Sequence, residues 1–321
     1  MPVLDSSYRS PFWLRSGHLQ TVAQALMGGH GPGAPRRERM ELEDGDFLDL
    51  DWWRGKSGES KGLAVICHGL EGSSSAGYVL RTASALRKSG WDVLAWNYRG
   101  CSGESNRLAR SYHSGGTEDL ARVIDRARRE VGDDAKVVLV GFSLGGNVAL
   151  KYVGERGDEC TVAAAVAISA PVDLASSAVS LDEWKGNRVY LARFLRTLTE
   201  KVRAKGERFP GRIDSRAYER VTSIRMVDEY YTAPVHGFEG AADYYARCSA
   251  RGFLAGIRAP SLLLNAANDP LLDEPSYPVE AAQESAFFHL ERPDRGGHVA
   301  FLGGDWLGRR VAGFLAVAER G

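Results

Sequence analysis

The sequence has few cysteines, and their spacing excludes two kinds of site. The four are Cys67, Cys101, Cys160 and Cys248, with no paired spacing between them. A disulfide framework or a CxxC-type zinc site would need a denser, paired pattern. No cluster of histidine, cysteine or carboxylate residues has the spacing of metal ligands either. We therefore expect reduced thiols in a cytosolic protein, with no metal and no cofactor.

Long hydrophobic runs and an excess of one charge are also missing. The longest apolar stretches have the length of strands, far below the ~20 residues of a membrane-spanning helix. The chain begins MPVLD, without the basic and apolar regions of a secretory signal. Basic and acidic residues both total 41, so the formal net charge is zero. These features predict no integral membrane segment, no nucleic-acid partner and a cytoplasmic location. They do not indicate an oligomeric state.

Short apolar runs instead alternate with longer amphipathic stretches along most of the chain. This alternation indicates a mostly parallel β-sheet flanked by helices, in a single α/β domain spanning residues 1–321. The expected strands are residues 39–43, 47–53, 63–67, 91–96, 136–140, 162–168, 261–266 and 286–290. The expected helices are residues 76–89, 117–131, 144–155 and 305–318. The turn-forming sequence DGD between the first two strands predicts an antiparallel hairpin.

The alternation stops between residues 171 and 257. This stretch is helical in pattern and charged, and it contains several tyrosine and tryptophan residues. Because strands and helices alternate again from residue 261, the stretch is inserted between two strands of one sheet. We predict that residues 171–257 form a helical lid rather than a second domain.

The sequence GFSLG at residues 141–145 has the Gly-x-Ser-x-Gly spacing of a nucleophile elbow. A serine at such a tight turn adopts a strained backbone conformation, and glycines two residues away avoid steric clash. The pattern alone also fits a structural glycine-rich turn. Its position between the apolar run 137–140 and an expected helix favours Ser143 as a catalytic nucleophile.

A serine hydroxyl needs a general base to become a strong nucleophile, and histidines late in the chain are the candidates. A nucleophile elbow is followed along the chain first by the acid and then by the histidine. Only His289 and His298 lie late enough in the sequence to be that histidine. His289 falls inside the apolar run 286–290, where a core or edge histidine is expected. His298 lies in the loop after that run, so we predict that it is the base. Asp269 directly follows the strand expected at 261–266 and is the predicted acid, although the sequence NDP also fits an ordinary turn.

A tetrahedral intermediate at Ser143 would need two backbone donors for its oxyanion. The amide of Leu144 follows the serine at the start of a helix, where the helix dipole favours negative charge. The second donor is expected in the sequence HGLEG at residues 68–72, where Leu70 is the best candidate. The serine run at residues 73–75 lacks the Gly-Lys-Ser/Thr ending of a phosphate-binding loop.

Three further segments have structural interpretations that we prefer to direct chemical roles. His68 is expected to brace its own loop by hydrogen bonding. His18 and the preceding FWL at residues 12–14 look like an N-terminal arm packed on the core, with a substrate-site role as the alternative. Residues 99–104 and His113 lie on the side of the sheet where strand ends form active sites, and they either brace loops or line a pocket.

Seven short motifs are spread along almost the whole chain. They are GHLQT (17–21), HGLEG (68–72), RGCSGE (99–104), YHSG (112–115), GFSLGGN (141–147), ADYY (242–245) and GGHV (296–299). Together they resemble the YheT-like family of α/β hydrolases, which is related to the eukaryotic ABHD lipid esterases. The resemblance implies the α/β-hydrolase fold and a triad at Ser143, Asp269 and His298.

The resemblance also implies hydrolysis of carboxylic esters, with small-molecule esters of short- to medium-chain acyl groups as substrates. The alternatives are an acyltransferase or thioesterase with the same triad, and a non-catalytic ligand-binding protein on the same fold. Relatives often carry Asp-Asp-Pro where Asn268 stands first here, which makes Asp269 less ambiguous as the acid. The membrane anchor of the animal relatives is missing from this sequence, which weakens the case for a membrane-lipid substrate.

Overall fold

The computed structural model describes residues 2–55, 60–132, 134–214, 218 and 220–316. Within these residues a nine-stranded sheet has the order β1-β9-β8-β7-β6-β4-β5-β3-β2. The pairs β2–β3 and β3–β5 are antiparallel, and the other neighbouring pairs are parallel. The strands are β1 (Val3–Leu4), β2 (Arg36–Glu41), β3 (Phe47–Trp53), β4 (Leu63–Cys67), β5 (Asp92–Asn97), β6 (Val137–Phe142), β7 (Ala164–Ile168), β8 (Ser261–Leu264) and β9 (Phe288–Glu291).

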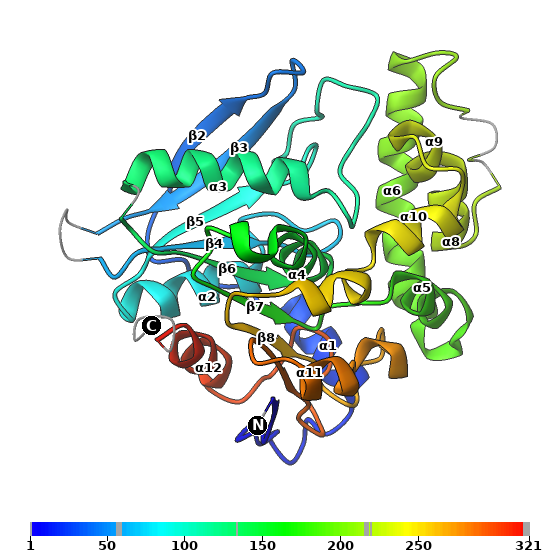
Figure 1. The fold of residues 1–321 in the computed structure, drawn as a ribbon. Helices are drawn as coiled ribbons and strands as arrows, with labels where there is room; N and C mark the ends of the chain where they lie inside the picture. The colour runs from blue at the N-terminus through cyan, green and yellow to red at the C-terminus, as the bar shows by residue number, and fades with distance from the viewer. Residues whose placement is uncertain (1, 56–59, 133, 215–217, 219, 317–321) are drawn as a thin grey trace.

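Helices cover both faces of this sheet (Figure 1). Helices α3 and α4 pack on one face, and α2 and α12 pack on the other. The α-helices are α1 (Gly17–Leu26), α2 (Gly77–Lys88), α3 (Thr117–Val131), α4 (Leu144–Arg156), α5 (Leu174–Glu183), α6 (Arg188–Arg208), α8 (Ile224–Val227), α9 (Ala233–His236), α10 (Ala241–Cys248), α11 (Val279–Glu284) and α12 (Trp306–Leu315). The short helical turns are η1 (Gly157–Glu159), η2 (Lys185–Asn187), η3 (Asp228–Thr232), η4 (Ala250–Gly256) and η5 (Glu274–Ser276).

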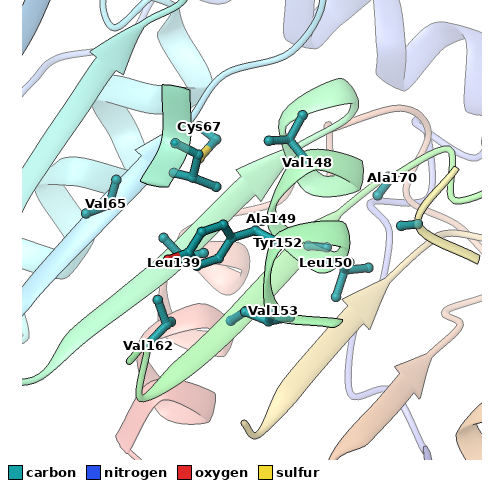
Figure 2. Close-up of a cluster of buried hydrophobic side chains, with 14 of the residues drawn as sticks. Val65, Cys67, Leu139, Val148, Ala149, Leu150, Tyr152, Val153, Val162 and Ala170 are labelled. Atoms are coloured by element: carbon teal, nitrogen blue, oxygen red, sulfur yellow. The ribbon is translucent and has the colours of Figure 1, made fainter. Parts of the chain in front are cut away.

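The central strands are apolar on both sides because each side is covered. In β4, Val65 and Cys67 belong to the cluster under α4, whereas Ala64 and Ile66 belong to the cluster under α2 and α12. Successive side chains of a strand point to opposite faces, so a strand buried on both faces has a continuous apolar run. Figure 2 shows the cluster on the α4 side, where Tyr152 lies over the sheet.

The strands and helices expected from the sequence are present, with bounds that differ by a few residues. The antiparallel hairpin pairs Glu41 with Phe47, and its first strand lies three residues earlier than expected at its start. The last predicted helix is present as α12, but its expected end at Ala318 lies outside the described residues. The sequence patterns did not predict β1, α1 or α11, which are short or have polar buried faces.

The prediction for the N-terminal arm was wrong for its aromatic residues. Phe12 and Trp13 are 75% and 66% exposed, so they do not pack on the core. Tyr8 packs there instead, with its ring 5.4 Å from that of Phe301 and its hydroxyl donating to Leu302 O at 2.6 Å. An aromatic residue with a polar tip can be buried where a hydrogen-bond acceptor is within reach.

The residues between β7 and β8 form a separate group of helices. Helices α5, α6, α8, α9 and α10 lie together on one side of the sheet in Figure 1. They contain two small apolar clusters of their own, one around Tyr244 and Tyr245 and one around Val202 and Tyr231. Among the described residues, no helix combines the length and the apolar character needed to cross a membrane.

Candidate active site

Ser143 lies at the sharp turn between β6 and α4. Its backbone has φ 51° and ψ −120°, a conformation that residues with a side chain rarely adopt. A Cβ atom at Gly141 would lie 2.3 Å from Gly145 O, and one at Gly145 would lie 2.4 Å from Cys67 O. Only glycine fits at these two positions, so the spacing of the motif follows from the tightness of the turn.

The structure brings together the three residues predicted to form the triad. Ser143 Oγ lies 2.9 Å from His298 Nε2. His298 Nδ1 lies 2.8 Å from Asp269 Oδ2 and 3.1 Å from Asp269 Oδ1. The Asp269 side chain is fully buried, and its Oδ1 also accepts a hydrogen bond from the Leu271 amide at 2.9 Å. The imidazole is therefore held between a buried carboxylate and a serine hydroxyl.

The loop that carries His298 is held by the N-terminal segment. The His298 amide donates to Thr21 Oγ1 at 2.8 Å, and Thr21 lies on α1. The Gly297 amide donates to Asn268 Oδ1 at 3.0 Å, and Asn268 Nδ2 donates to Arg15 O at 3.1 Å. The contact between α1 and these two loops gives a structural reason for the GHLQT motif. Its glycine, Gly17, has no room for a side chain beside Asn268.

The two predicted oxyanion donors lie at the same cavity as Ser143. Leu70 and Leu144 both line it, and a Cβ atom on Gly69 would lie 3.2 Å from Ser143 Cβ. Within the described residues, neither the Leu70 amide nor the Leu144 amide donates to a protein acceptor. Backbone donors without a protein partner at a catalytic cavity are available to a ligand oxygen.

The side chains of His68 and Tyr78 fix the loop that contains Leu70. His68 contacts Gly69 O through Nδ1 at 2.8 Å and accepts from the Tyr98 amide through Nε2 at 3.3 Å. Burial lowers the pKa of His68 to about 4, so the ring is neutral at pH 7 and can act as donor and acceptor together. The Gly69 amide donates to the hydroxyl of Tyr78 at 2.9 Å. The prediction that His68 braces its loop agrees with these contacts.

Glu71 is the next residue of this loop, and it connects the loop to α6. Its amide donates to the Tyr112 hydroxyl at 2.9 Å, and that hydroxyl donates back to Glu71 Oε1 at 2.8 Å. Lys201 of α6 places its Nζ 2.9 Å from the same Oε1. Burial alone would lower the pKa of Lys201, but Cys101 and Glu71 raise it above its ordinary value, so the lysine stays charged. Sequence reasoning missed this contact because the two residues are 130 positions apart.

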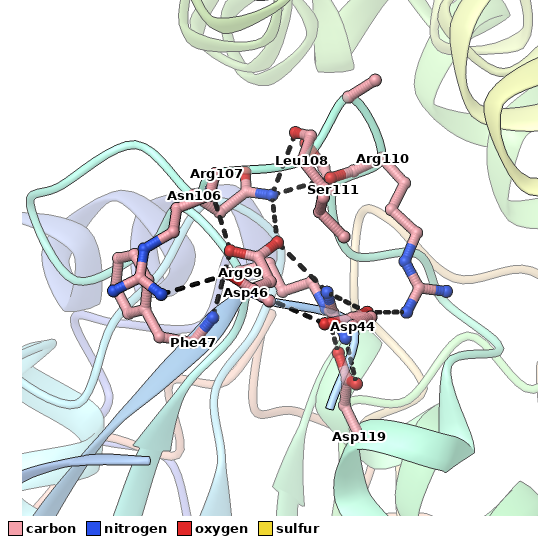
Figure 3. A network of polar contacts seen from close by, with 12 residues as sticks. Asp44, Asp46, Phe47, Arg99, Asn106, Arg107, Leu108, Arg110, Ser111 and Asp119 are labelled. Atoms are coloured by element: carbon pink, nitrogen blue, oxygen red, sulfur yellow. Dashed lines mark hydrogen bonds and ion pairs between the residues drawn. The ribbon is translucent and has the colours of Figure 1, made fainter. Parts of the chain in front are cut away.

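A buried arginine holds the loop after β5. Arg99 donates through Nε and Nη2 to Asp119 at 2.6 and 2.7 Å, and through Nη1 to Asp44 at 2.8 Å and Asp46 at 3.1 Å. Asn106 Nδ2 donates to Asp46 at 2.7 Å, as Figure 3 shows. Of the two interpretations of residues 99–104, loop bracing therefore describes Arg99, although the same loop also lines the cavity.

Two cavities meet at Ser143, His298 and the two predicted amide donors. The larger has a volume of about 940 Å³ and is lined by polar and apolar groups from α1, the loops after β4 and β5, and α6. The smaller has a volume of about 100 Å³ and is mainly apolar. Its walls include Leu174, Ala178, Leu181 and Leu272. The site can thus separate an apolar group from a larger, partly polar one.

The other histidines near the site do not form a metal centre. His113 lines the larger cavity, with its ring 4.5 Å from that of His236. Burial and the neighbouring His236 lower the pKa of His113 to about 3, which keeps it neutral. No group of three or more potential metal ligands occurs among the residues that the structure describes. His289 lies in β9, with its ring 5.7 Å from that of Phe314.

Comparison with known proteins agrees with this architecture. A family model described as "alpha/beta hydrolase fold" matches residues 64–305, which is most of the chain. The solved esterase Pf2001 of Pyrococcus furiosus superposes with a TM-score of 0.58 at 18% identity, covering 91% of this chain and 98% of that one. The chain belongs to the α/β hydrolase family.

Two relatives place it more narrowly within that family. The Escherichia coli protein named "Putative esterase YheT" is 37% identical, over 93% of this chain and 89% of its own length. Phospholipase ABHD3 of Mus musculus is 27% identical, over 95% of this chain and 75% of its own length. The YheT-like resemblance of the motifs is thereby confirmed.

Proposed function

We propose that this protein hydrolyses carboxylic esters with Ser143 as nucleophile, His298 as general base and Asp269 as the residue that orients His298. The protein is a carboxylic ester hydrolase, as its family and its esterase and phospholipase relatives indicate. The observation that carries the residue assignment is the continuous contact from Ser143 Oγ through His298 to the buried Asp269. A chain of this geometry activates a serine by removing its proton.

The reaction then takes two steps. His298 Nε2 accepts the proton of Ser143 as the oxygen attacks the ester carbonyl, and the carbonyl oxygen becomes an oxyanion. The amides of Leu70 and Leu144 stabilise that charge, since backbone donors already in place need no reorganisation. His298 returns the proton to the departing alcohol, and water then cleaves the acyl-enzyme by the same route. Asp269 keeps Nδ1 protonated and stabilises the imidazolium.

The two cavities favour an assignment for the two halves of the substrate. The small, apolar cavity suits an acyl group of short to medium length, because apolar walls bind a hydrocarbon chain without leaving polar groups unpaired. The larger cavity suits the alcohol half and its departure. Helices from residues 171–257 supply walls to both cavities, which supports the proposal that they act as a lid.

Acyl transfer is a second candidate, favoured by the size of the larger cavity. A volume of about 940 Å³ beside Ser143 leaves room for an alcohol or thiol group as well as water. The same acyl-enzyme would then pass its acyl group to that acceptor. Hydrolysis in the presence of ethanol separates the two, because a transferase forms ethyl ester in preference to free acid.

Labelling with a fluorophosphonate probe tests the nucleophile directly. Wild-type protein should react, and Ser143→Ala should not. The variant should also lose about 10⁴–10⁶-fold in kcat on p-nitrophenyl esters. Equal labelling of wild type and Ser143→Ala would disprove the assignment. A series of p-nitrophenyl esters with increasing acyl length would test the acyl assignment, with kcat/KM expected to fall once the chain outgrows the small cavity.

A further inference from the structure

Helix α1 has its polar and apolar faces reversed. Gln20, Thr21 and Gln24 are buried, although they are polar. Leu19, Val22 and Leu26 are 57%, 41% and 82% exposed. Residues spaced by three and four positions share one face of a helix, so these three form an apolar stripe that faces away from the protein. A surface helix normally buries such a stripe.

Hydrogen bonds fix α1 in this orientation. Gln20 Oε1 lies 3.1 Å from the Tyr8 hydroxyl, and its Nε2 donates to Ser10 Oγ at 3.3 Å. Thr21 holds the amide of His298, and Arg81 donates to Gln24 Oε1. Rotating the helix to bury its leucines would leave these buried polar groups without hydrogen-bond partners, which is unfavourable. The exposure of the apolar stripe is therefore built into the fold.

The apolar stripe lies at the active-site cavity. Val22, Leu26 and Met27 line the larger cavity, and so does Val189 from the first turn of α6, which is 72% exposed. His18 Nδ1 lies 3.1 Å from the Tyr190 hydroxyl, so the starts of α1 and α6 are in direct contact. We call the set Leu19, Val22, Leu26, Met27 and Val189 the apolar rim. Exposed apolar side chains gathered at a cavity mark an interaction surface.

The two segments that carry the apolar rim have an excess of basic residues. Residues 6–35 contain two arginines, Arg9 and Arg15, and no acidic residue. Helix α6 contains seven basic residues and two acidic ones, and Arg188 and Arg193 on its first two turns are exposed. This contrasts with the zero formal charge of the whole chain. A basic border favours an anionic partner and disfavours a second copy of the same surface.

We propose that the apolar rim docks on an anionic lipid surface, so that the active-site cavity faces that surface. Apolar side chains with a basic border enter the boundary between headgroups and acyl chains, where burial and charge attraction add. Acyl esters dissolved in such a surface would then reach Ser143 without crossing water. This docking is peripheral, and it does not depend on which residues perform the chemistry.

Flotation with lipid vesicles tests the proposal. Wild-type protein should float with vesicles of phosphatidylcholine and phosphatidylglycerol, and less with phosphatidylcholine alone. Leu19→Ser, and the double variant Leu26→Ser with Val189→Ser, should each weaken the partition at least tenfold. Phe287→Ser is the matched control. Phe287 is exposed and directly precedes β9, at the end of the strand away from the active site, so this variant should bind as wild type does. Thermal unfolding of each variant checks that it is folded.

Charge and catalysis are tested separately. Arg15→Gln and Arg188→Gln should lower binding to the anionic vesicles, with little change on neutral ones. The inactive Ser143→Ala should bind vesicles as wild type does, so failure of docking and failure of the proposed chemistry are distinguishable. Absence of vesicle binding by wild type at low salt would overturn the proposal. A stable dimer in solution that Leu19→Ser converts to monomer would also overturn it, because a second copy would then cover the rim.

Discussion

Helices α4 and α6 both border the active site, but the protein holds them in different ways. Eleven of the 13 residues of α4 are buried, and most of them are apolar or glycine. Only Val202 and Lys205 are buried among the 21 residues of α6. Helix α4 is held by close packing on the sheet. Helix α6 is held by a few contacts, including those of Lys201 and Lys205.

This difference matches what each helix positions. Helix α4 begins at the Ser143 turn, where misplacement by about 1 Å can cost 10²-fold in rate. Close packing allows little adjustment, so it suits a part that must not move. Helix α6 lines the larger cavity and contacts the loops after β4 and β5 through polar groups. Segments with few buried apolar contacts open at lower free-energy cost.

The largest effect is expected from overpacking α4. In Gly145→Ala the new methyl group would lie 2.4 Å from Cys67 O and 2.5 Å from His68 O, both backbone atoms. We expect a loss of about 1–3 kcal/mol in the free energy of unfolding. We also expect kcat on p-nitrophenyl esters to fall by at least about 10²-fold, because both the Ser143 turn and the Leu70 loop must shift.

The control for that change is a second helical glycine. A Cβ atom on Gly313 of α12 would meet no atom within 4 Å. Gly313→Ala should therefore leave kcat unchanged and stabilise the fold by about 0.4–1 kcal/mol. Urea unfolding and steady-state kinetics measure both variants. Equal behaviour of the two alanines would contradict the idea that α4 has no room to adjust.

A smaller and more local effect is expected from α6. Lys205 Nζ donates to Leu108 O, Ala109 O and Arg110 O at 2.6, 3.3 and 3.2 Å. Lys205→Met should cost about 1–3 kcal/mol by leaving these carbonyls unpaired. We expect faster proteolytic cleavage within residues 171–257, while the sheet stays protected. Arg203→Met is the charge-matched control on the same helix, and because Arg203 is exposed it should change little.

The inserted helices should also lose stability as pH rises. Burial raises the pKa of Asp228 to about 7, and its Oδ2 accepts from the Tyr245 hydroxyl at 2.8 Å. The folded state binds this proton more tightly than the unfolded chain does. The contribution of Asp228 to stability is therefore full below about pH 4 and is lost as the pH rises through about 7. The expected loss is about 2–4 kcal/mol.

Hydrogen exchange in α10, compared at pH 5 and pH 8, measures this loss. Asp228→Asn cannot ionise, so it should reduce the pH dependence. A residual slope is expected from Asp182, whose pKa is also raised by burial. An unchanged slope in Asp228→Asn would contradict the assignment to this carboxyl group.

The smallest effect is expected at the contact between α6 and the Leu70 loop. The Lys201 side chain is 36% exposed, so its ion pair with Glu71 contributes at most about 1 kcal/mol. Lys201→Met should therefore lower kcat by less than about tenfold, with KM nearly unchanged. Lys201→Arg keeps the charge and should restore most of the rate. A loss as large as that of Gly145→Ala would mean that α6 is as closely coupled to the chemistry as α4.

The sequence predicted the part of the fold whose side chains follow simple periodicity. Strands such as β4 and β6 are apolar on both faces, and their order along the chain led to Ser143, Asp269 and His298, which the structure brings into contact. The α/β fold and the YheT-like family are confirmed. The roles of these residues and of the two amides stay predictions until the variants are measured.

The rest depended on contacts that no local pattern contains. Helix α1 was missed because its buried residues are polar, so its periodicity is opposite to that of a usual surface helix. The bond from the His298 amide to Thr21 spans 277 positions, and the Glu71–Lys201 pair spans 130. The GHLQT motif did mark the place of α1, but its residue types did not indicate that it supports His298.

The bond between Thr21 and the His298 amide has a consequence for where this protein can be shortened. The family model begins at residue 64, so it leaves out the whole of α1. A chain trimmed to that boundary would keep Ser143, Asp269 and His298 but would lose the hydroxyl that positions the histidine loop. The part of the chain that holds His298 in place is therefore longer than the matched region, and it includes α1.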